Sequence, residues 1–228
     1  MTGITAIDAL ARLSVVIPAL NAAATLPVTL GCLDGVAEIV VADGGSSDGT
    51  QAIAAAAGAW VLKLPRGRGT QIAGGIAAAR QPWLLLLHAD TRLDADWRAA
   101  VAARMADTGQ AGYFRFALDA AHWRARLLCC AVALRCRLFA LPYGDQGLLI
   151  HRDLLHAAGG MRALPLMEDV DLVRRLGRRR LVAMQAAAVT SAARWERDGW
   201  ARRSARNLLC LCLYFLGVKP ATIARLYA

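Results

Sequence analysis

The chain has 228 residues, of which 57% are hydrophobic, and it carries a formal net charge of +10. A chain of this size and apolar content can bury a full core as one large domain, which argues against a largely disordered protein. Nearly all of the basic residues are arginines, whose planar groups grip phosphate and carboxylate oxygens, so an anionic nucleotide, nucleic acid or membrane surface is expected as a partner. The alternative explanation of the positive charge is an arginine-rich coding bias, with the arginines spread over a solvated surface.

The cysteines and the apolar segments indicate a cellular location. The six cysteines form no CxxC pair and have no zinc-ligand spacing, which fits a reducing compartment. The N-terminal segment lacks the pattern of a secretory signal. The late apolar run 208–218 is far shorter than the roughly 20 residues that a spanning helix needs. The sequence therefore predicts a cytoplasmic protein that does not cross a membrane.

The first half of the chain alternates strand and helix patterns, which is typical of a parallel sheet with helical crossovers. In chain order we expect strand 13–17, helix 22–33, strand 38–42, helix 50–57, strand 60–64, helix 69–79, strand 83–87 and helix 95–106. Pro18 is expected to end the first strand because proline has no N–H to donate. These four strand–helix units predict a doubly wound half-sheet.

The second half is less regular. We expect strand 112–118, helix 123–139, strand 147–151, short helix 153–158, helix 170–176, strands 181–184 and 187–190, and a long amphipathic helix 200–216. No repeat, linker or low-complexity tract divides the chain. The predicted fold is thus a single α/β domain over 1–228, with a nucleotide-facing half at about 12–110 and an acceptor-facing half at about 111–228.

Two acidic loops follow buried strands of this predicted sheet. VVADGGSSDGT (40–50) places Asp43, and LLLLHADT (84–91) places Asp90, where a strand leaves the sheet. Ligands of open α/β sheets bind at this edge. Alternate residues of an extended segment share a face, so His88 and Asp90 are expected to hold one Mn²⁺ or Mg²⁺ ion that bridges a diphosphate. A turn with no ligand is the alternative for Asp43.

Two further segments lie beside these loops in the predicted sheet. Pro18 and Asn21 follow the first strand and are either a strand end with a helix cap or the floor of a base pocket. Arg66, Arg68 and Gln71 open a helix, whose N-terminus favours anions. Neither a P-loop nor a GxGxxG pattern follows a strand, which argues against the common mononucleotide and dinucleotide folds.

The second half adds acids at two positions. Asp145 and Gln146 precede a predicted strand, and Glu168, Asp169 and Asp171 open a predicted helix. Acids in a first helical turn often only stabilise the helix dipole, and this remains the alternative for Glu168 and Asp171. Asp169 is the candidate general base, because transfer to a hydroxyl needs a group that takes its proton.

Five of these segments occur together in a known order. PALNAAATL, VADGGSSDGT, GRGTQIAGG, LHADT and MEDVDL resemble the motifs of family 2 glycosyltransferases with the GT-A fold. GDQG, LPLMEDVDLVRRL and ARWERDGW are similar to small bacterial transferases found beside radical-SAM and selenoprotein-type genes. The resemblance runs from about residue 12 to the C-terminus.

The resemblance implies an inverting transfer of one sugar from a nucleoside-diphosphate sugar, most commonly UDP-linked, to a hydroxyl acceptor, with Mn²⁺ or Mg²⁺. It implies a donor site formed by Pro18, Asn21, Asp43, Arg68, Gln71 and Asp90. It implies Asp90 with His88 at the metal and Asp169 as the base. The acceptor side would include Asp145, Gln146, Glu168, Arg194 and Trp195.

The chain departs from the family pattern at three positions. His88 stands where the first acid of the DxD motif is usual, which weakens the metal assignment. Ala22 replaces an acid that often follows the first strand. Ser191–Trp195 (SAARW) echoes only part of the QxxRW motif of processive synthases, which favours transfer of a single sugar over polymer synthesis.

The predicted C-terminal helix has an apolar face of helical spacing. Its members are Leu208, Leu209, Cys212, Phe215 and Leu216, with Arg202, Arg203 and Arg206 upstream. Core packing or a homodimer seam is one interpretation, and docking on the inner face of the cytoplasmic membrane, near a lipid-linked acceptor, is the other.

Two other functions compete with the transferase. A sugar-phosphate nucleotidyltransferase would usually carry a basic glycine-rich loop after the first strand, and the PALNAAATL segment lacks one. A non-enzymatic basic module for membrane or nucleic acid explains the charge but not the ordered acidic motifs. We expect no nucleic-acid partner, because basic patches with stacking aromatics are not evident.

Overall fold

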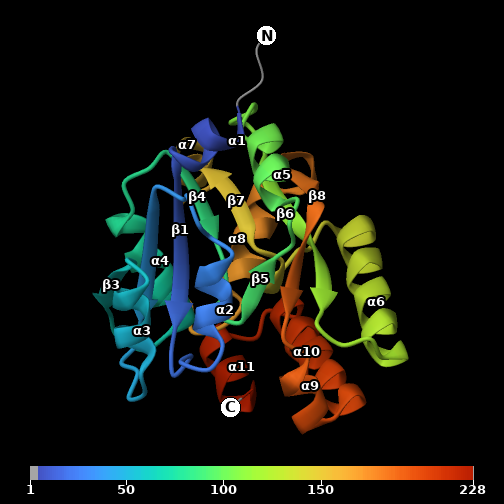
Figure 1. Cartoon of the computed structure of the whole chain (residues 1–228). Coiled ribbons are helices and arrows are strands. Elements are labelled where there is room, and N and C mark those ends of the chain that lie inside the picture. Colours follow the sequence, from blue (N-terminus) through green and yellow to red (C-terminus); the bar gives the residue numbers. More distant parts are fainter. Residues whose placement is uncertain (1–4, 228) are drawn as a thin grey trace.

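The computed structural model describes residues 5–227 of the chain. This part of the chain contains one eight-stranded sheet in the order β3-β2-β1-β4-β7-β6-β8-β5 (Figure 1). The strands are β1 (Leu13–Ala19), β2 (Glu38–Asp43), β3 (Trp60–Lys63), β4 (Trp83–Leu86), β5 (Thr91–Leu93), β6 (Ala111–Leu118), β7 (Leu148–His151) and β8 (Leu181–Thr190). The predicted α/β architecture is confirmed.

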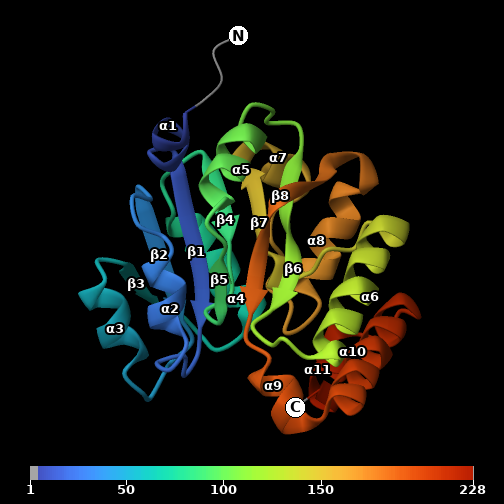
Figure 2. The same cartoon turned by 45° about the vertical axis from the view of Figure 1, so that its right-hand side comes forward.

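Helices flank this sheet on both faces (Figures 1 and 2). The α-helices are α1 (Ala6–Leu10), α2 (Leu26–Gly31), α3 (Thr50–Ala56), α4 (Arg68–Ala78), α5 (Trp97–Arg104), α6 (Trp123–Phe139), α7 (Arg152–Ala157), α8 (Glu168–Leu176), α9 (Ala193–Asp198), α10 (Trp200–Phe215) and α11 (Pro220–Tyr227). Two short 3-10 helices are η1 (Gly144–Gln146) and η2 (Arg178–Arg180). None of the helices within residues 5–227 is long and apolar enough to cross a bilayer.

The sheet has two parts of different strand direction. β3, β2, β1 and β4 are mutually parallel, as the alternating pattern of the first half predicts. β7 then runs antiparallel to both β4 and β6, β6 and β8 are parallel, and β5 closes the edge antiparallel to β8. The carboxyl ends of β1, β2 and β4 therefore meet at one edge, where the loops predicted to carry the site begin.

Both faces of the central strands are covered, which explains why their sequences are continuous apolar runs rather than alternating ones. On one face, buried side chains of α1, α2, α3 and α5 pack against the sheet, among them Trp97. On the other, α4, α7 and α8 contribute Ile72, Leu155 and Leu172. Each large side chain that is fully buried stabilises the fold by about 1.5–3 kcal/mol.

Pro18 does not end the first strand as predicted; it is paired with Ala42 inside β1. In a parallel ladder, alternate residues bond to opposite neighbours, and Val16 accepts from Leu87 on the β4 side. Pro18 lies two residues after Val16, so its nitrogen also faces β4. The last β4 residue that pairs with β1 is Leu86, opposite Val16, so no β4 residue pairs with Pro18. The missing N–H costs no ladder hydrogen bond there, so β1 continues to Ala19.

Other differences from the predicted elements involve tertiary contacts. The predicted helix 22–33 shortens to α2, and in the turn before it the backbone N–H groups of Ala22 and Ala23 bond to Thr50 and Asp48. β8 is one strand rather than two, and its register against β6 shifts between Tyr113 and Arg115. α1, β5, α9 and α11 were not predicted; β5, for example, has only three residues and forms by pairing with distant β8.

Candidate active site

Asp43 is the last residue of β2, and its side chain is completely buried. Its Oδ2 accepts hydrogen bonds from the backbone N–H groups of Gly45 and Ser46, each at 3.0 Å, and from the Gln51 amide at 2.8 Å. Burial favours a higher pKa for Asp43, but the hydrogen bonds outweigh it and hold the pKa below its usual value. Its Oδ1 is buried without a partner, so an ionised oxygen is available to a ligand.

The loop after Asp43 is joined to the loop after β1. The Asn21 N–H donates to Ser46 Oγ at 2.9 Å, and Asn21 Oδ1 accepts from the Ser47 N–H at 2.9 Å. Asn21 has a φ of 50°, which asparagine tolerates better than most residues. It therefore does not cap α2, whose N-cap is Thr25. The two loops form one fixed edge beside Asp43.

Gln71 lies beneath this edge and is buried. Its Nε2 donates to the carbonyl oxygens of Ala19 and Ala42, at 2.7 and 2.8 Å, at the ends of β1 and β2. Both amide hydrogens are used, so Gln71 acts on the predicted donor site by holding the strand ends. The predicted direct contact with a nucleotide sugar has no free donor to support it.

The segment after β4 turns rather than continuing as extended chain, because the Thr91 N–H bonds to the His88 carbonyl at 3.3 Å. The extended geometry predicted for His88 and Asp90 is therefore wrong. Asp90 lies in this turn, and its Oδ2 is 3.1 Å from a guanidinium nitrogen of Arg194 on α9. His88 is held neutral, since burial and then the charge of Arg68 lower its pKa to about 4.

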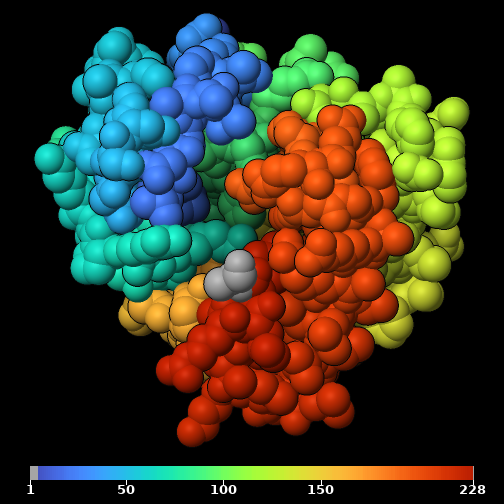
Figure 3. Space-filling model, turned by 90° about the horizontal axis from the view of Figure 1, so that it is seen from below, coloured from blue at the N-terminus to red at the C-terminus, as the bar shows by residue number. Residues whose placement is uncertain are grey.

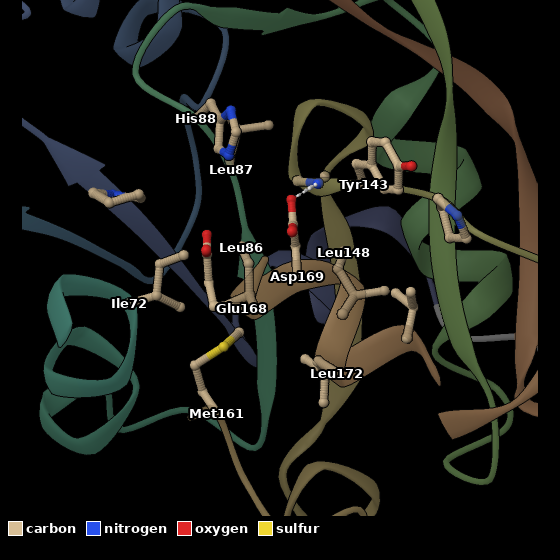
Figure 4. A pocket seen from close by; sticks show the side chains of 15 residues that line it. Ile72, Leu86, Leu87, His88, Tyr143, Leu148, Met161, Glu168, Asp169 and Leu172 are labelled. Atoms are coloured by element: carbon tan, nitrogen blue, oxygen red, sulfur yellow. Dashed lines mark hydrogen bonds between the residues drawn. The ribbon is translucent and has the colours of Figure 1, made fainter. Parts of the chain in front are cut away.

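Glu168 and Asp169 open α8 and point toward the same side as His88 (Figure 4). Asp169 Oδ2 accepts from the Gly144 N–H at 2.8 Å and lies 3.6 Å from Arg68 Nη2. Burial works to raise the pKa of Asp169, but Arg68 and the hydrogen bonds from the Gly144 and Val170 N–H groups outweigh it and lower the pKa. Asp169 is thus an ionised carboxylate facing a pocket.

Arg68 is the counter-charge of both acids. Its Nε bonds to Oε1 of Glu168, which is completely buried, and this pairing raises the pKa of the guanidinium despite burial. The predicted contact of Arg68 with donor phosphates therefore competes with an existing ion pair. Glu168 is not a mere helix-dipole acid, because Oε2 is buried with no partner while Oε1 binds across the site. Burial, the larger influence, raises the pKa of Glu168.

Gly144 separates the candidate base from His88. A Cβ at this position would lie 2.5 Å from His88 Nε2 and 3.1 Å from Asp169 Oδ2. Only glycine leaves the imidazole and the carboxylate this close together while its N–H binds Asp169. The segment YGDQG was noted in the sequence, but the role of its glycine was not predicted.

Asp145 and Gln146 of the same segment differ in availability. Asp145 Oδ1 is buried without a partner, and burial raises the pKa of Asp145 to about 6. Gln146 is buried: its amide donates to the Phe114 carbonyl at 3.0 Å, and its oxygen accepts from Arg135 at 3.2 Å. Gln146 therefore fixes the loop, and its predicted acceptor contact stays a prediction.

Arg194 and Trp195, also predicted on the acceptor side, take separate positions. Arg194 is the exposed partner of Asp90. Trp195 is buried against Phe116 at 6.4 Å between ring centroids, with the Arg203 guanidinium 5.0 Å from its ring. Trp195 is thus a packing residue whose ring N–H is buried without a partner, and its predicted acceptor contact stays a prediction.

One pocket collects residues from motifs that lie far apart in the chain. His88, Pro18, Gly144, Glu168 and Asp169 line it, above a floor of apolar side chains that are labelled in Figure 4: Ile72, Leu148, Met161 and Leu172. Asp43 does not line this pocket; it lies at the end of β2, separated from β4 by β1. Figure 3 looks onto this edge and shows a hollow between the blue-to-cyan segment and the orange segment of the chain.

Sequence reasoning missed several residues that position the site. Gln51 holds Asp43 from the first turn of α3, and its short separation in sequence could have indicated it. Arg135 lies 3.6 Å over the Tyr143 ring and bonds to Gln146, yet it comes from a helix with no motif. Its role depends on a tertiary contact that spacing along the chain does not reveal.

The fit to a divalent ion can be judged from the donor groups. His88 has a neutral ring with a buried, unpartnered Nε2, and Asp90 supplies a carboxylate. Within residues 5–227, no group of three or more His, Cys, Asp or Glu side chains is arranged to hold a metal. Two protein donors suit an ion that takes its remaining ligands from a diphosphate and water.

Comparison with known families and proteins matches these features. The model of the family described as "Glycosyl transferase family 2" matches residues 14–128. Uncharacterized glycosyltransferases of Mycobacterium tuberculosis and Mycobacterium bovis are 36% identical over 83 residues, which is 36% of this chain. The match spans 38% of the length of those relatives. No comparison bears on the resemblance to transferases beside radical-SAM genes, which stays a prediction.

Solved structures of GT-A glycosyltransferases share the fold. Glucosyl-3-phosphoglycerate synthase from M. tuberculosis is 22% identical, with a TM-score of 0.54 over 80% of this chain and 73% of that one. TarS residues 1–349 from S. aureus are 15% identical, with a TM-score of 0.63 over 79% and 60%. The predicted GT-A fold is thereby confirmed.

Proposed function

Because the chain belongs to glycosyl transferase family 2, we propose that it moves one sugar from a nucleoside-diphosphate sugar to a hydroxyl acceptor, with inversion at the anomeric carbon. The observation that carries this proposal is the setting of Asp169. Its carboxylate is kept ionised by Arg68 and the Gly144 N–H and faces the pocket that His88 and Pro18 also line.

The donor is proposed to be UDP-linked. Asp43 offers a buried anionic oxygen with no partner in the protein, and such an oxygen accepts from an imide N–H or a ribose hydroxyl. The synthase from M. tuberculosis was solved with Mn²⁺, UDP and phosphoglyceric acid, and TarS was solved with UDP and with UDP-GlcNAc. The hydrogen bonds to Asn21 and Gln71 support the proposal by keeping the strand ends in place around Asp43.

The proposed reaction is a single displacement. The acceptor oxygen forms a bond to the anomeric carbon, the bond from that carbon to the diphosphate oxygen breaks, and the acceptor proton passes to Asp169. The nucleoside diphosphate leaves from the face opposite to attack, which inverts the configuration. Fixing the base through Gly144 and Arg68 reduces the reorganisation that the step requires.

Asp90 and His88 are proposed to hold Mn²⁺ or Mg²⁺ together with the donor diphosphate. A divalent ion at this position supplies charge that stabilises the leaving diphosphate. The ion pair with Arg194 keeps the Asp90 carboxylate oriented before any ligand binds. Arg194 also brings positive charge to the side of the pocket where the diphosphate is proposed to lie.

Family membership favours the transferase over the nucleotidyltransferase and the non-enzymatic basic module. The acceptor is proposed only as a hydroxyl group. On the acceptor side, Asp145 has a buried oxygen without a partner. The cytoplasmic location, a lipid-linked acceptor and a homodimer stay predictions, as do the donor sugar and the transfer of a single residue.

The proposal can be tested by thermal shift with UDP, GDP, ADP and TDP and their sugars, with and without Mn²⁺. A ligand that binds only the folded state raises its stability by mass action, by about 2.7 kcal/mol at a hundredfold excess over Kd. We expect a shift with one base that depends on Mn²⁺ and is lost in Asp43→Ala. The matched variant Asp34→Ala, on an exposed loop, should keep the shift. Equal shifts in both variants, or none in the wild type, would contradict the proposed donor site.

A further inference from the structure

Two helices of the second half expose apolar faces to solvent. On α6 the exposed side chains are Trp123, Leu127, Leu134, Leu138 and Phe139; on α10 and just after it they are Leu208, Leu209, Phe215 and Leu216. Leu127 and Leu208, for example, are 62% and 61% exposed. Soluble proteins seldom expose so many large apolar side chains in one region. Residues 123, 127, 134 and 138 repeat at helical spacing, so they form one outward stripe along α6.

The two helices are neighbours along their length. At their first turns, the His122 ring stacks on Trp200 with centroids 6.0 Å apart. At the other end, Leu141, just beyond α6, shares a hydrophobic cluster with Leu211 and Tyr214 of α10. Both cartoon views show α6 and α10 side by side (Figures 1 and 2). We call the two exposed stripes together the α6–α10 face.

The inward face of α10 is already occupied, so its outward leucines are not needed by the core. Arg203 is buried and binds Asp198 at 2.7 Å, and Arg206 approaches the same carboxylate at 3.4 Å. Cys210 is buried, and Leu211 packs near the start of α8. Of the interpretations left open for this helix, core packing does not apply to Leu208 and Leu209, because both are exposed.

The charge around the α6–α10 face is mainly positive, although the exposed acids Asp119 and Glu196 lie beside its His122 end. α6, α10 and α11 contain arginines and no Asp or Glu. Arg124, Arg126, Arg137 and Arg202 are exposed, and Arg178 donates to carbonyls of the last turn of α6, which brings 178–180 to that end. On α9, Asp198 is neutralised by Arg197, Arg203 and Arg206, which leaves Glu196 as the acid of that helix without such a pairing.

We propose that the α6–α10 face docks on an anionic lipid bilayer surface. Apolar side chains flanked by arginines match both layers of such a surface: the leucines and Trp123 enter the acyl boundary, and the guanidinium groups bind the headgroup phosphates. A second copy of the chain fits less well, because a symmetric contact would bring arginines against arginines. A nucleic acid would satisfy the arginines but would leave the leucines exposed.

The docked orientation would bring the lipid surface close to the candidate active site. The inward side of α10 packs with Tyr143 and Met167, which flank Gly144 and Glu168 of the site. The docking surface and the pocket are therefore two sides of one helix layer. The docking proposal does not depend on the transfer reaction.

The test is flotation of the full chain with vesicles of phosphatidylcholine alone or of phosphatidylcholine mixed with anionic phosphatidylglycerol. We expect binding to the anionic vesicles, weakened by salt. Leu208→Gln with Leu209→Gln, and separately Leu127→Gln with Leu134→Gln, should each weaken it more than about tenfold, since each leucine loses its apolar burial. Arg126→Gln and Arg137→Gln should each weaken it about fivefold.

Ile7→Gln with Arg12→Gln is the matched control, because both residues are exposed near the opposite, amino-terminal end of β1. The control should bind as the wild type does, and all variants should keep the wild-type unfolding midpoint. Failure of the wild type to float with anionic vesicles would overturn the proposal, as would an equal loss in the control. A wild-type dimer in solution that the Leu208/Leu209 variant dissociates, without vesicle binding, would assign the face to a second copy instead.

Discussion

The two halves of the candidate site are held by different kinds of interaction. On the β1–β2 side, Asp43, Asn21 and Gln71 are fixed by hydrogen bonds to neighbouring backbone groups. On the β7–α8 side, Glu168 is held by Arg68 from another element, and Asp169 is held by the Gly144 N–H together with the charge of Arg68. Hydrogen bonds to backbone define one geometry, whereas a guanidinium can exchange a carboxylate for a phosphate. The first side is therefore a rigid frame, and the second can rearrange around a substrate.

This difference means that function and stability should separate between the two sides. A change on the β7–α8 side should alter the chemistry and leave nucleotide binding in place, because the frame around Asp43 does not depend on it. A change on the β1–β2 side should lower the stability of the sheet edge first.

Asp169→Asn is expected to have the largest effect. Loss of the proton acceptor should lower kcat by about 10²–10⁴-fold, while the thermal shift with the nucleoside diphosphate stays unchanged. Release of nucleoside diphosphate from the donor sugar measures kcat. Asp153→Asn is the control, since Asp153 is also a first-turn acid but lies exposed on α7. Full turnover in Asp169→Asn would show that Asp169 is not the base. Loss of nucleotide binding would show that the two sides of the site are not independent.

Gln71→Ala should reduce the free energy of unfolding by about 2 kcal/mol. The substitution removes the two hydrogen bonds that Gln71 donates to the Ala19 and Ala42 carbonyls, while the Ala19 carbonyl keeps the Gly44 N–H at 2.9 Å; each lost hydrogen bond costs about 1 kcal/mol. Denaturant unfolding measures the change. Gln185→Ala on β8 is the control, because Gln185 is exposed and should cost little. Equal effects of the two substitutions would show that Gln71 does not hold the strand ends.

The sequence predicted well what depends on short separations. The strands of the parallel half and the helix 123–139 have the expected positions, because apolar runs and helical spacing determine them locally. Asp43 lies at a strand end as predicted, since the position of a loop residue follows from the strand before it.

What the sequence could not predict depends on long-range contacts. The ion pair of Arg68 with Glu168 joins residues 100 positions apart, and no local pattern indicates that the arginine faces an acid rather than an anion. β5 forms only because β8 pairs with it. Gln146 and Trp195 were predicted as ligand contacts, but both are buried in packing and hydrogen bonds that appear only once the second half is folded.

Asp145→Asn should have the smallest effect, and its sign depends on pH. Burial raises the pKa of Asp145 to about 6, against 3.8 in the unfolded chain. Between these values the folded state binds more protons than the unfolded state, so this group costs stability as pH rises from about 4 to above 6. An asparagine carries no such charge. The difference in free energy of unfolding between the variant and the wild type should therefore be about 1–2 kcal/mol more favourable to the variant at pH 7.5 than at pH 4.

Denaturant unfolding of the Asp145 variant and the wild type at both pH values measures this gain. Asp34→Asn on an exposed loop is the matched control for the substitution itself. A gain that grows with pH would mean that the β7–α8 side keeps a buried carboxylate at a cost to stability, as expected where a ligand normally supplies the missing partner of Oδ1. If the difference in free energy of unfolding between the variant and the wild type is the same at both pH values, Asp145 is solvated. The β7–α8 side then has no stability cost from burying this carboxylate.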